Sequence, residues 1–148
     1  MGLYLRESTE EDMDLLYEWA NDPVVRRNAF HTEAIPYETH VKWFRQMLEN
    51  KTVHQYILCR AEEPVGQIRL NIEDGTGLID YSVAPKQRGK GLGAVLLELV
   101  KEKAGETETV TRLMGQVKNE NIASVRTFEK CGYQKTEEKS YITFVYEL

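Results

Sequence analysis

Three glycines alternate with other residues in the segment Gln87-Arg88-Gly89-Lys90-Gly91-Leu92-Gly93. The segment lies between an apolar stretch at 78–83 that predicts a strand and an amphipathic stretch at 92–104 that predicts a helix. Glycine leaves backbone N–H groups uncovered, and a helix N-terminus carries partial positive charge. With Arg88 and Lys90 beside these groups, the segment is predicted to bind an anion, and a phosphate in particular.

The spacing of these glycines excludes the two commonest phosphate-binding loops. A P-loop needs glycine, four residues and then Gly-Lys-Ser/Thr, which the chain lacks. The dinucleotide-binding loop needs G-x-G-x-x-G, whereas this segment contains G-x-G-x-G. The pattern Arg88-x-x-Gly91-x-Gly93 instead resembles the R/Q-x-x-G-x-G/A pyrophosphate loop of the GNAT family of N-acetyltransferases, which hold acetyl-coenzyme A. The arginine, the lysine and both flanking elements disfavour the alternative, a glycine-rich helix cap on a solvated surface.

A second segment, from Asn119 to Tyr133, strengthens this resemblance. It is similar to the family's N-x-x-S/A and aromatic-E-K-x-G-F/Y helix, which lines the pantetheine and the thiol end of the cofactor. The resemblance implies that backbone amides of the glycine loop bind the pyrophosphate and that pantetheine pairs with the strand backbone near Val83. The residues that it assigns to acetyl-CoA are Val83, Arg88, Gly89, Lys90, Gly91, Leu92, Gly93, Ala94, Asn121, Ser124, Phe128 and Lys130.

Acetyl transfer to an amine by direct attack needs a neutral amine, stabilisation of the thioester oxygen and a proton for the leaving thiolate. Many family members donate that proton from a tyrosine at the position of Phe128, and phenylalanine has no proton to donate. Tyr81 and Ser124 are candidate donors in its place, although Tyr81 can equally be core packing and water can protonate the thiolate. Asp80, or an ordered water held by the backbone, is a candidate for taking the amine's proton. A backbone N–H near Tyr81 to Val83 is a candidate for stabilising the thioester oxygen. No other Glu or His stands out as a base, which favours amines of low pKa.

The N-terminal third carries the acceptor side in this family. The W-x-N-D-P-x-V-R string at 19–26 resembles several bacterial branches, including ribosomal-protein N-terminal acetyltransferases. The H-x-x-W-F string at 40–44 and the strand at 66–69 are more similar to acetyltransferases of nonulosonic-acid biosynthesis, which modify a nucleotide-linked amino sugar, as in the pseudaminic-acid pathway. We therefore expect acceptor contacts from Arg26, His31, His40 and Arg69.

Three functions follow from these patterns. The preferred one is N-acetylation of a nucleotide-linked amino sugar, and the alternative is acetylation of an N-terminal peptide, a ribosomal protein or another small amine. A non-catalytic acyl-CoA-binding domain is the third. Phe128 favours that last function, whereas the intact glycine loop opposes it.

These residues must be positioned by helices and strands. The order of the helices and strands that we expect predicts one α+β domain over residues 1–148, with a mixed, mostly antiparallel sheet flanked by about four helices. A capping box of Ser8 and Glu11 is expected before the first helix. The GNAT resemblance adds a splay between the strands ending at Val83 and Val117. The expected elements are a strand at 3–6, a helix at 13–20, an irregular connection at 21–36, a helix at 37–50, strands at 55–60, 65–72 and 78–83, a helix at 92–104, a strand at 112–117, a helix at 121–131 and a hairpin at 133–148.

The composition of the chain excludes some classes of binding partner. A net charge of −5 argues against a general nucleic-acid binder, and no apolar run is long enough for a membrane span. The N-terminus lacks a signal-peptide pattern, and Cys59 and Cys131 form neither a disulfide framework nor a metal site. We expect a cytoplasmic monomer or homodimer that takes a small-molecule amine.

Overall fold

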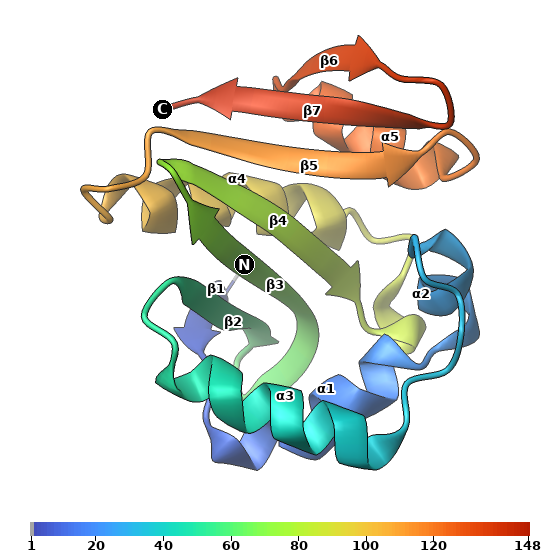
Figure 1. Ribbon diagram of the computed structural model, residues 1–148, viewed down its shortest axis with the longest axis vertical. Helices are drawn as coiled ribbons and strands as arrows, with labels where there is room; N and C mark the ends of the chain where they lie inside the picture. Colours follow the sequence, from blue (N-terminus) through green and yellow to red (C-terminus); the bar gives the residue numbers. More distant parts are fainter. Residues whose placement is uncertain (1) are drawn as a thin grey trace.

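Residues 2–148, which the computed structural model describes, form a seven-stranded sheet and five α-helices (Figure 1). The strand order in the sheet is β1-β2-β3-β4-β5-β7-β6. The predicted α+β architecture with a mixed, mostly antiparallel sheet is confirmed. The strands are β1 (Leu3–Glu7), β2 (Val53–Arg60), β3 (Glu63–Glu73), β4 (Thr76–Val83), β5 (Arg112–Lys118), β6 (Gln134–Glu137) and β7 (Tyr141–Glu147). The helices are α1 (Met13–Ala20), α2 (Pro23–Asn28), α3 (Tyr37–Glu49), α4 (Leu92–Gly105) and α5 (Ile122–Lys130), with 3-10 turns at Glu10–Asp12 and Pro85–Gln87.

The two central strands, β4 and β5, separate after a short contact. They pair in parallel only where Thr76–Leu78 faces Arg112–Met114, while the other neighbouring strands pair antiparallel along their lengths. Beyond Leu78, and within residues 2–148, β4 has no strand partner on its β5 side. Figure 1 shows the two strands diverging toward the side where α2 lies. The expected splay is therefore confirmed, and it leaves backbone groups of β4 available to a ligand.

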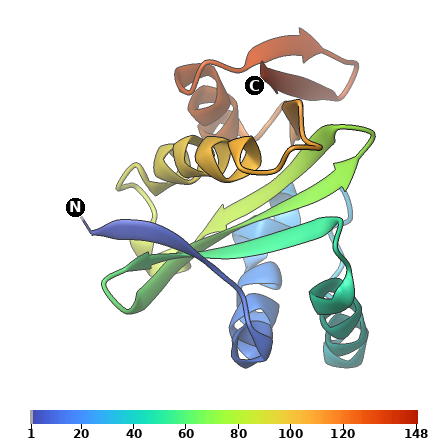
Figure 2. The same cartoon turned by 90° about the vertical axis from the view of Figure 1, so that its left-hand side faces the viewer.

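A separate apolar core packs on each face of the sheet. The side chains of a strand point alternately to the two faces, so β2 contributes to both cores. Tyr56 and Leu58 join a cluster with α4 and α5, whereas Ile57 and Cys59 join a smaller cluster with α1 and α3. Figure 2 shows α4 on the opposite side of the sheet from α1 and α3. Within residues 2–148, none of these helices is long and apolar enough to cross a bilayer.

The connection expected to be irregular at 21–36 contains a helix, α2, which is the fifth helix where about four were predicted. The prediction used Pro23 only as a stop for the preceding helix. Proline is also favoured at the first position of a helix, and Asp22 before it accepts hydrogen bonds from the N–H groups of Val24 and Val25. The sequence Asp22-Pro23 therefore starts a new helix.

The expected capping box lies one residue further along the chain. Thr9 and Asp12, rather than Ser8 and Glu11, exchange side-chain and backbone hydrogen bonds before α1. Asp12 is buried, and it also accepts two hydrogen bonds from the Arg6 guanidinium, at 2.8 and 2.9 Å. The Arg6 guanidinium is the main cause that holds the pKa of the Asp12 carboxyl below its usual value.

We expect Asp12→Asn to lower the free energy of unfolding by about 1.5–3 kcal/mol near pH 7, the contribution of a hydrogen bond to a charged group. The native pKa of this carboxyl is depressed, so its stabilisation is complete above the unfolded pKa of about 3.9 and is lost as the pH falls further. The difference in the free energy of unfolding between wild type and variant should therefore stay constant from pH 7 to about pH 4 and shrink as the pH falls further. Urea unfolding across this range measures the difference, and a difference that stays constant below about pH 4 contradicts the assignment.

Candidate active site

A cavity of about 750 Å³ occupies the opening between β4 and β5, a volume typical of small-molecule sites. Its walls come from α2, the loop before α4, the diverging strands and α5. The register of β3 and β4 places Asp80 and Ser82 on the sheet face that α1 and α3 cover, and Tyr81 and Val83 on the α4 face. The cavity thus reaches both faces of the sheet through the splay.

The glycine loop is open toward solvent and ends at the start of α4. Gly89 and Gly91 have φ of +80° and +77°, a left-handed backbone that favours glycine, and a Cβ on either would meet nothing within 4 Å. Gly91 is the N-cap of α4, and within residues 2–148 no side chain caps this helix start. The first N–H groups of α4 are therefore available to an anion, as the glycine spacing predicts.

The side chains of the two cations beside the glycines each have a hydrogen-bond partner within the protein. The Arg88 Nη2 donates to the Asp22 Oδ2 at 2.6 Å, which forms an ion pair with the segment before α2. The Lys90 Nζ donates to the Gln87 Oε1 at 3.2 Å, and Lys90 does not line the cavity. Lys90, which was predicted at the cofactor site, thus lies beside the cavity lining, and its role there stays a prediction. Gly89 and Gly91, on either side of Lys90, do line the cavity.

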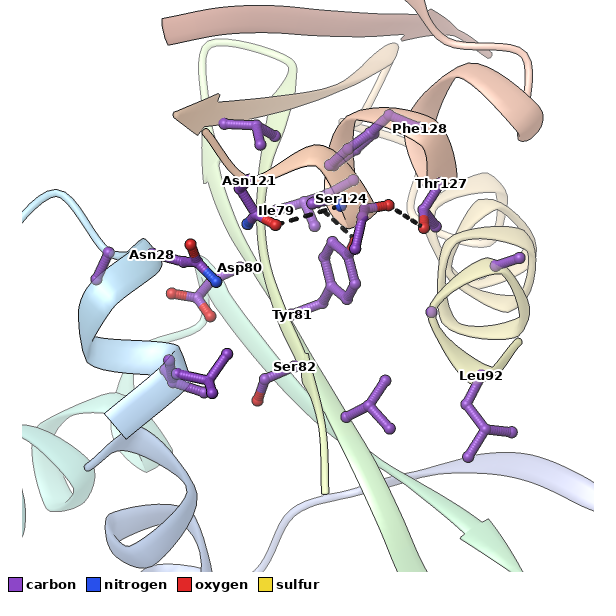
Figure 3. A pocket seen from close by; sticks show the side chains of 18 of the residues that line it. Asn28, Ile79, Asp80, Tyr81, Ser82, Leu92, Asn121, Ser124, Thr127 and Phe128 are labelled. Carbon is purple, nitrogen blue, oxygen red and sulfur yellow. Dashed lines mark hydrogen bonds between the residues drawn. The ribbon is translucent and has the colours of Figure 1, made fainter. Parts of the chain in front are cut away.

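Tyr81 and Ser124, the two candidate proton donors, are hydrogen-bonded to each other, with 2.7 Å between their oxygens (Figure 3). Tyr81 comes from β4 and Ser124 from the first turn of α5, so the pair spans the splay. Burial is the main cause that raises the pKa of the Tyr81 phenol above its usual value. The phenol is therefore protonated at neutral pH and has a proton to donate.

Asn121 and Phe128 both have structural roles on α5. The Asn121 Oδ1 accepts a hydrogen bond from the Ser124 N–H at 3.3 Å and caps the helix, as expected for a plain helix cap. The Phe128 ring is 2% exposed and stacks on Phe144 with 4.9 Å between ring centroids. A Cβ at Gly115 would lie only 2.4 Å from the Phe128 ring, so β5 needs glycine there. Both residues still border the cavity.

A chain of polar side chains supports Asp80 on the other face of the sheet. The buried Gln55 donates from Nε2 to the Gln67 Oε1 at 2.8 Å. Gln67 in turn donates to the Asp80 Oδ1 at 3.2 Å and to the Ser82 hydroxyl at 3.1 Å. The second carboxylate oxygen of Asp80 accepts from the Arg69 Nη2 at 3.2 Å. Asp80 is thus held by both oxygens at the cavity wall.

Residues 2–134 match the family described as Acetyltransferase (GNAT) domain. The chain belongs to the GNAT family. It is therefore an acetyl-CoA-dependent N-acetyltransferase, as the two motifs implied. The pyrophosphate site at the open glycine loop stays a prediction.

Several characterised acetyltransferases are similar to this one. Aminoglycoside N(6')-acetyltransferase type 1 of Klebsiella pneumoniae is 28% identical over 147 residues, which cover 88% of this chain and 73% of the relative. Acetyltransferase PseH of Campylobacter jejuni is 19% identical over 124 residues, which cover 84% of this chain and 78% of the relative. The structure of spermidine N-acetyltransferase from Vibrio cholerae with CoA and spermine has the same fold, with a TM-score of 0.90 at 14% identity over 99% of this chain and 95% of that one.

Only some of the residues that were expected to contact the acceptor line the cavity of this acetyltransferase. Arg26 and Arg69 line it, but Arg26 donates to the backbone carbonyls of Ala20, His31 and Glu33 and so organises the loop after α2. His31 is exposed outside the lining. His40 is buried between α1 and α3, where its Nε2 contacts the Met13 carbonyl at 2.9 Å. Burial is the main cause that lowers the pKa of His40, and this side chain lies outside the cavity lining.

Arg126 is a cavity residue that the motifs did not single out. It lies on α5 one turn before Lys130, and both line the cavity without an ion pair in residues 2–148. A spacing of four residues places two side chains on one face of a helix. The i, i+4 spacing from Lys130, which was expected at the cofactor, is the sequence pattern that could have indicated Arg126.

Proposed function

We propose that this acetyltransferase transfers the acetyl group of acetyl-CoA to the amine of a nucleotide-linked amino sugar, by direct attack in a ternary complex. The observation that carries the proposal is the charge of the cavity. Among the described residues that line it, Asp80 is the one acid, against the five cations Arg26, Arg69, Arg88, Arg126 and Lys130. Such a lining suits two ligands that both carry phosphate groups.

Polycationic acceptors fit this cavity less well. Aminoglycosides and polyamines carry several ammonium groups, and a site for them needs several carboxylates because like charges repel at close range. Asp80 alone is available, and Arg69 already neutralises it. The aminoglycoside relative, at 28% identity, nevertheless makes an aminoglycoside the second candidate acceptor.

Arg69 is the proposed contact for the acceptor's diphosphate. Its guanidinium lies over the Trp43 ring, 4.9 Å from the centroid, and donates to Asp80 at the cavity wall. Stacking on the ring and pairing with the carboxylate restrict the side chain, which lowers the entropy cost of binding an anion. Asp80, between Arg69 and Gln67, is then placed to receive the proton of the attacking amine.

Tyr81 and Ser124 complete the proposed reaction. As the tetrahedral intermediate collapses, the C–S bond breaks and its electron pair stays on the sulfur. A proton from the Tyr81–Ser124 pair neutralises that sulfur as CoA thiol, and free N–H groups of β4 stabilise the oxygen while it carries charge. We also propose that the reaction occurs in the cytoplasm, where the buried free thiols of Cys59 and Cys131 stay reduced.

A panel of acceptors tests this function. We expect thiol release from acetyl-CoA with UDP-4-amino sugars, and much slower release with kanamycin, spermine or N-terminal peptides. Arg69→Gln should raise the KM for the sugar about tenfold or more while the KM for acetyl-CoA stays unchanged, because a charged hydrogen bond contributes about 1.5–3 kcal/mol. Arg45→Gln, on the exposed face of α3, is the matched control. Faster turnover with kanamycin would overturn the sugar in favour of the second candidate, and no thiol release with any amine would overturn the enzyme mechanism.

A further inference from the structure

Helix α2 forms one wall of the cavity without being part of a core. Val24, Val25 and Asn28 line the cavity, yet none of the six residues of α2 is buried. A short helix with little buried apolar surface is easily opened. Its position therefore depends on the contacts at its two ends.

The C-terminal end of α2 is attached to the far side of the splay. The Lys118 Nζ, at the end of β5, donates to the Arg27 carbonyl at 3.1 Å. Phe30, two residues after the helix, packs edge-on against Tyr141 of β7, with 5.8 Å between the ring centroids. These contacts hold the segment after α2 across the open side of the cavity.

The N-terminal end of α2 is attached to the cofactor loop. The Asp22 Oδ2 accepts the N–H groups of Val24 and Val25 at 3.1 and 3.3 Å, and also the Arg88 guanidinium at 2.6 Å. The side chain of Asp22 is only 13% exposed, so its charge is poorly screened by water. One carboxylate thus joins the start of α2 to the residue immediately before Gly89.

Arg88 can contact Asp22 and a phosphate at the same time. A guanidinium has five N–H donors in a planar fork, and one of its nitrogens accounts for the contact with Asp22. Arg88 is itself part of the cavity lining, and its side chain is 33% exposed. An anion in the glycine loop would therefore fix Arg88, and Arg88 would fix Asp22.

We propose that the Arg88–Asp22 ion pair transmits cofactor binding to α2, so that acetyl-CoA sets the acceptor wall before the acceptor binds. Asp22 is then a positioning residue and touches neither substrate. The inference rests on cofactor binding at the glycine loop but not on the identity of the acceptor. Because coupling between two sites is reciprocal, an acceptor held by α2 would also tighten the binding of acetyl-CoA.

Hydrogen exchange with CoA alone as the ligand tests this coupling. In the wild type, we expect CoA to slow the exchange of amides at 24–30 by about tenfold, because local opening of α2 becomes less favourable. Asp22→Asn should abolish this slowing while CoA still binds, since asparagine caps a helix as well as aspartate but carries no charge for Arg88. Arg88→Gln breaks the pair from its other side and should also abolish the slowing. Glu33→Gln, in the exposed loop after α2, removes a carboxylate outside the pair and should behave as the wild type.

Calorimetric titration of CoA distinguishes a failure of the coupling from a failure of CoA binding. CoA that binds the wild type without slowing amide exchange at 24–30 would overturn the coupling alone. Equal slowing in the wild type and in Asp22→Asn would also overturn it, because the charge of Asp22 would then be unnecessary. A wild type that does not bind CoA would overturn the cofactor site on which both this inference and the proposed function depend.

Discussion

Replacing Gly91 with valine is expected to raise the KM for acetyl-CoA by about 100-fold or more. Gly91 has φ of +77°, which a β-branched residue adopts only with strain, and its missing Cβ faces open space at the start of α4. The valine would therefore distort the loop and occupy the space that the pyrophosphate needs. Losing two charged hydrogen bonds to backbone N–H groups costs about 3 kcal/mol or more, which corresponds to the expected factor.

Isothermal titration of CoA and steady-state kinetics measure this effect directly. Gly105→Ala is the matched control, because it adds a Cβ at the other end of α4, where the backbone is not left-handed and nothing lies within 4 Å. The control should bind CoA as the wild type does. If Gly91→Val also bound CoA with unchanged affinity, the glycine loop would not be the pyrophosphate site. Circular dichroism and thermal unfolding confirm that both variants are folded.

Tyr81→Phe is expected to lower kcat by about 100-fold, the lower end of the range for general acid catalysis, with little change in the KM for acetyl-CoA. The phenol lies 2.7 Å from Ser124 on the opposite wall of the splay, and phenylalanine keeps the ring in place while removing the proton. Burial raises the pKa of Tyr81, so the alkaline limb of the wild-type kcat profile should lie above about pH 10.

The Tyr81–Ser124 pair predicts non-additive effects. If one proton path uses both hydroxyls, Tyr81→Phe with Ser124→Ala should be little slower than the more damaging single variant. Tyr37→Phe is the control, because it removes a hydroxyl that hydrogen-bonds Asp14 on α1, and it should leave kcat unchanged. Full activity in both Tyr81→Phe and Ser124→Ala would show that the thiolate takes its proton from water, which leaves Tyr81 as core packing.

The cofactor side of this protein was predictable because its features are local in sequence. Glycines at a strand-to-helix junction dictate an exposed turn and an open helix start, and both appear at Gly89 and Gly91. Alternating apolar residues with turn residues between them also predicted the meander of β2, β3 and β4 and the closing hairpin. Each of these features depends on neighbouring residues and not on distant ones.

The acceptor side depends on contacts between distant residues, which a single sequence does not reveal. Arg88 pairs with Asp22, 66 residues away, so the motif alone could not show that its guanidinium is engaged. His40 has the spacing of a surface histidine near a helix start, yet the packing of α1 on α3 buries it. Gln67 was part of a recognised strand, but its link to Asp80 depends on the register between β3 and β4.

The two apolar clusters lie on opposite faces of the sheet, and this separation affects which substitutions the enzyme can combine. The glycine loop, the proposed cofactor site, leads into α4 of the larger cluster, whereas the proposed acceptor contacts Arg69 and Asp80 lie on the face that α1 and α3 cover. Because the clusters share no buried side chain, substitutions in one should be nearly additive with those in the other. Substitutions around α1 and α3 should therefore alter the proposed acceptor side with little effect on the proposed donor side, and the Arg88–Asp22 ion pair connects the two.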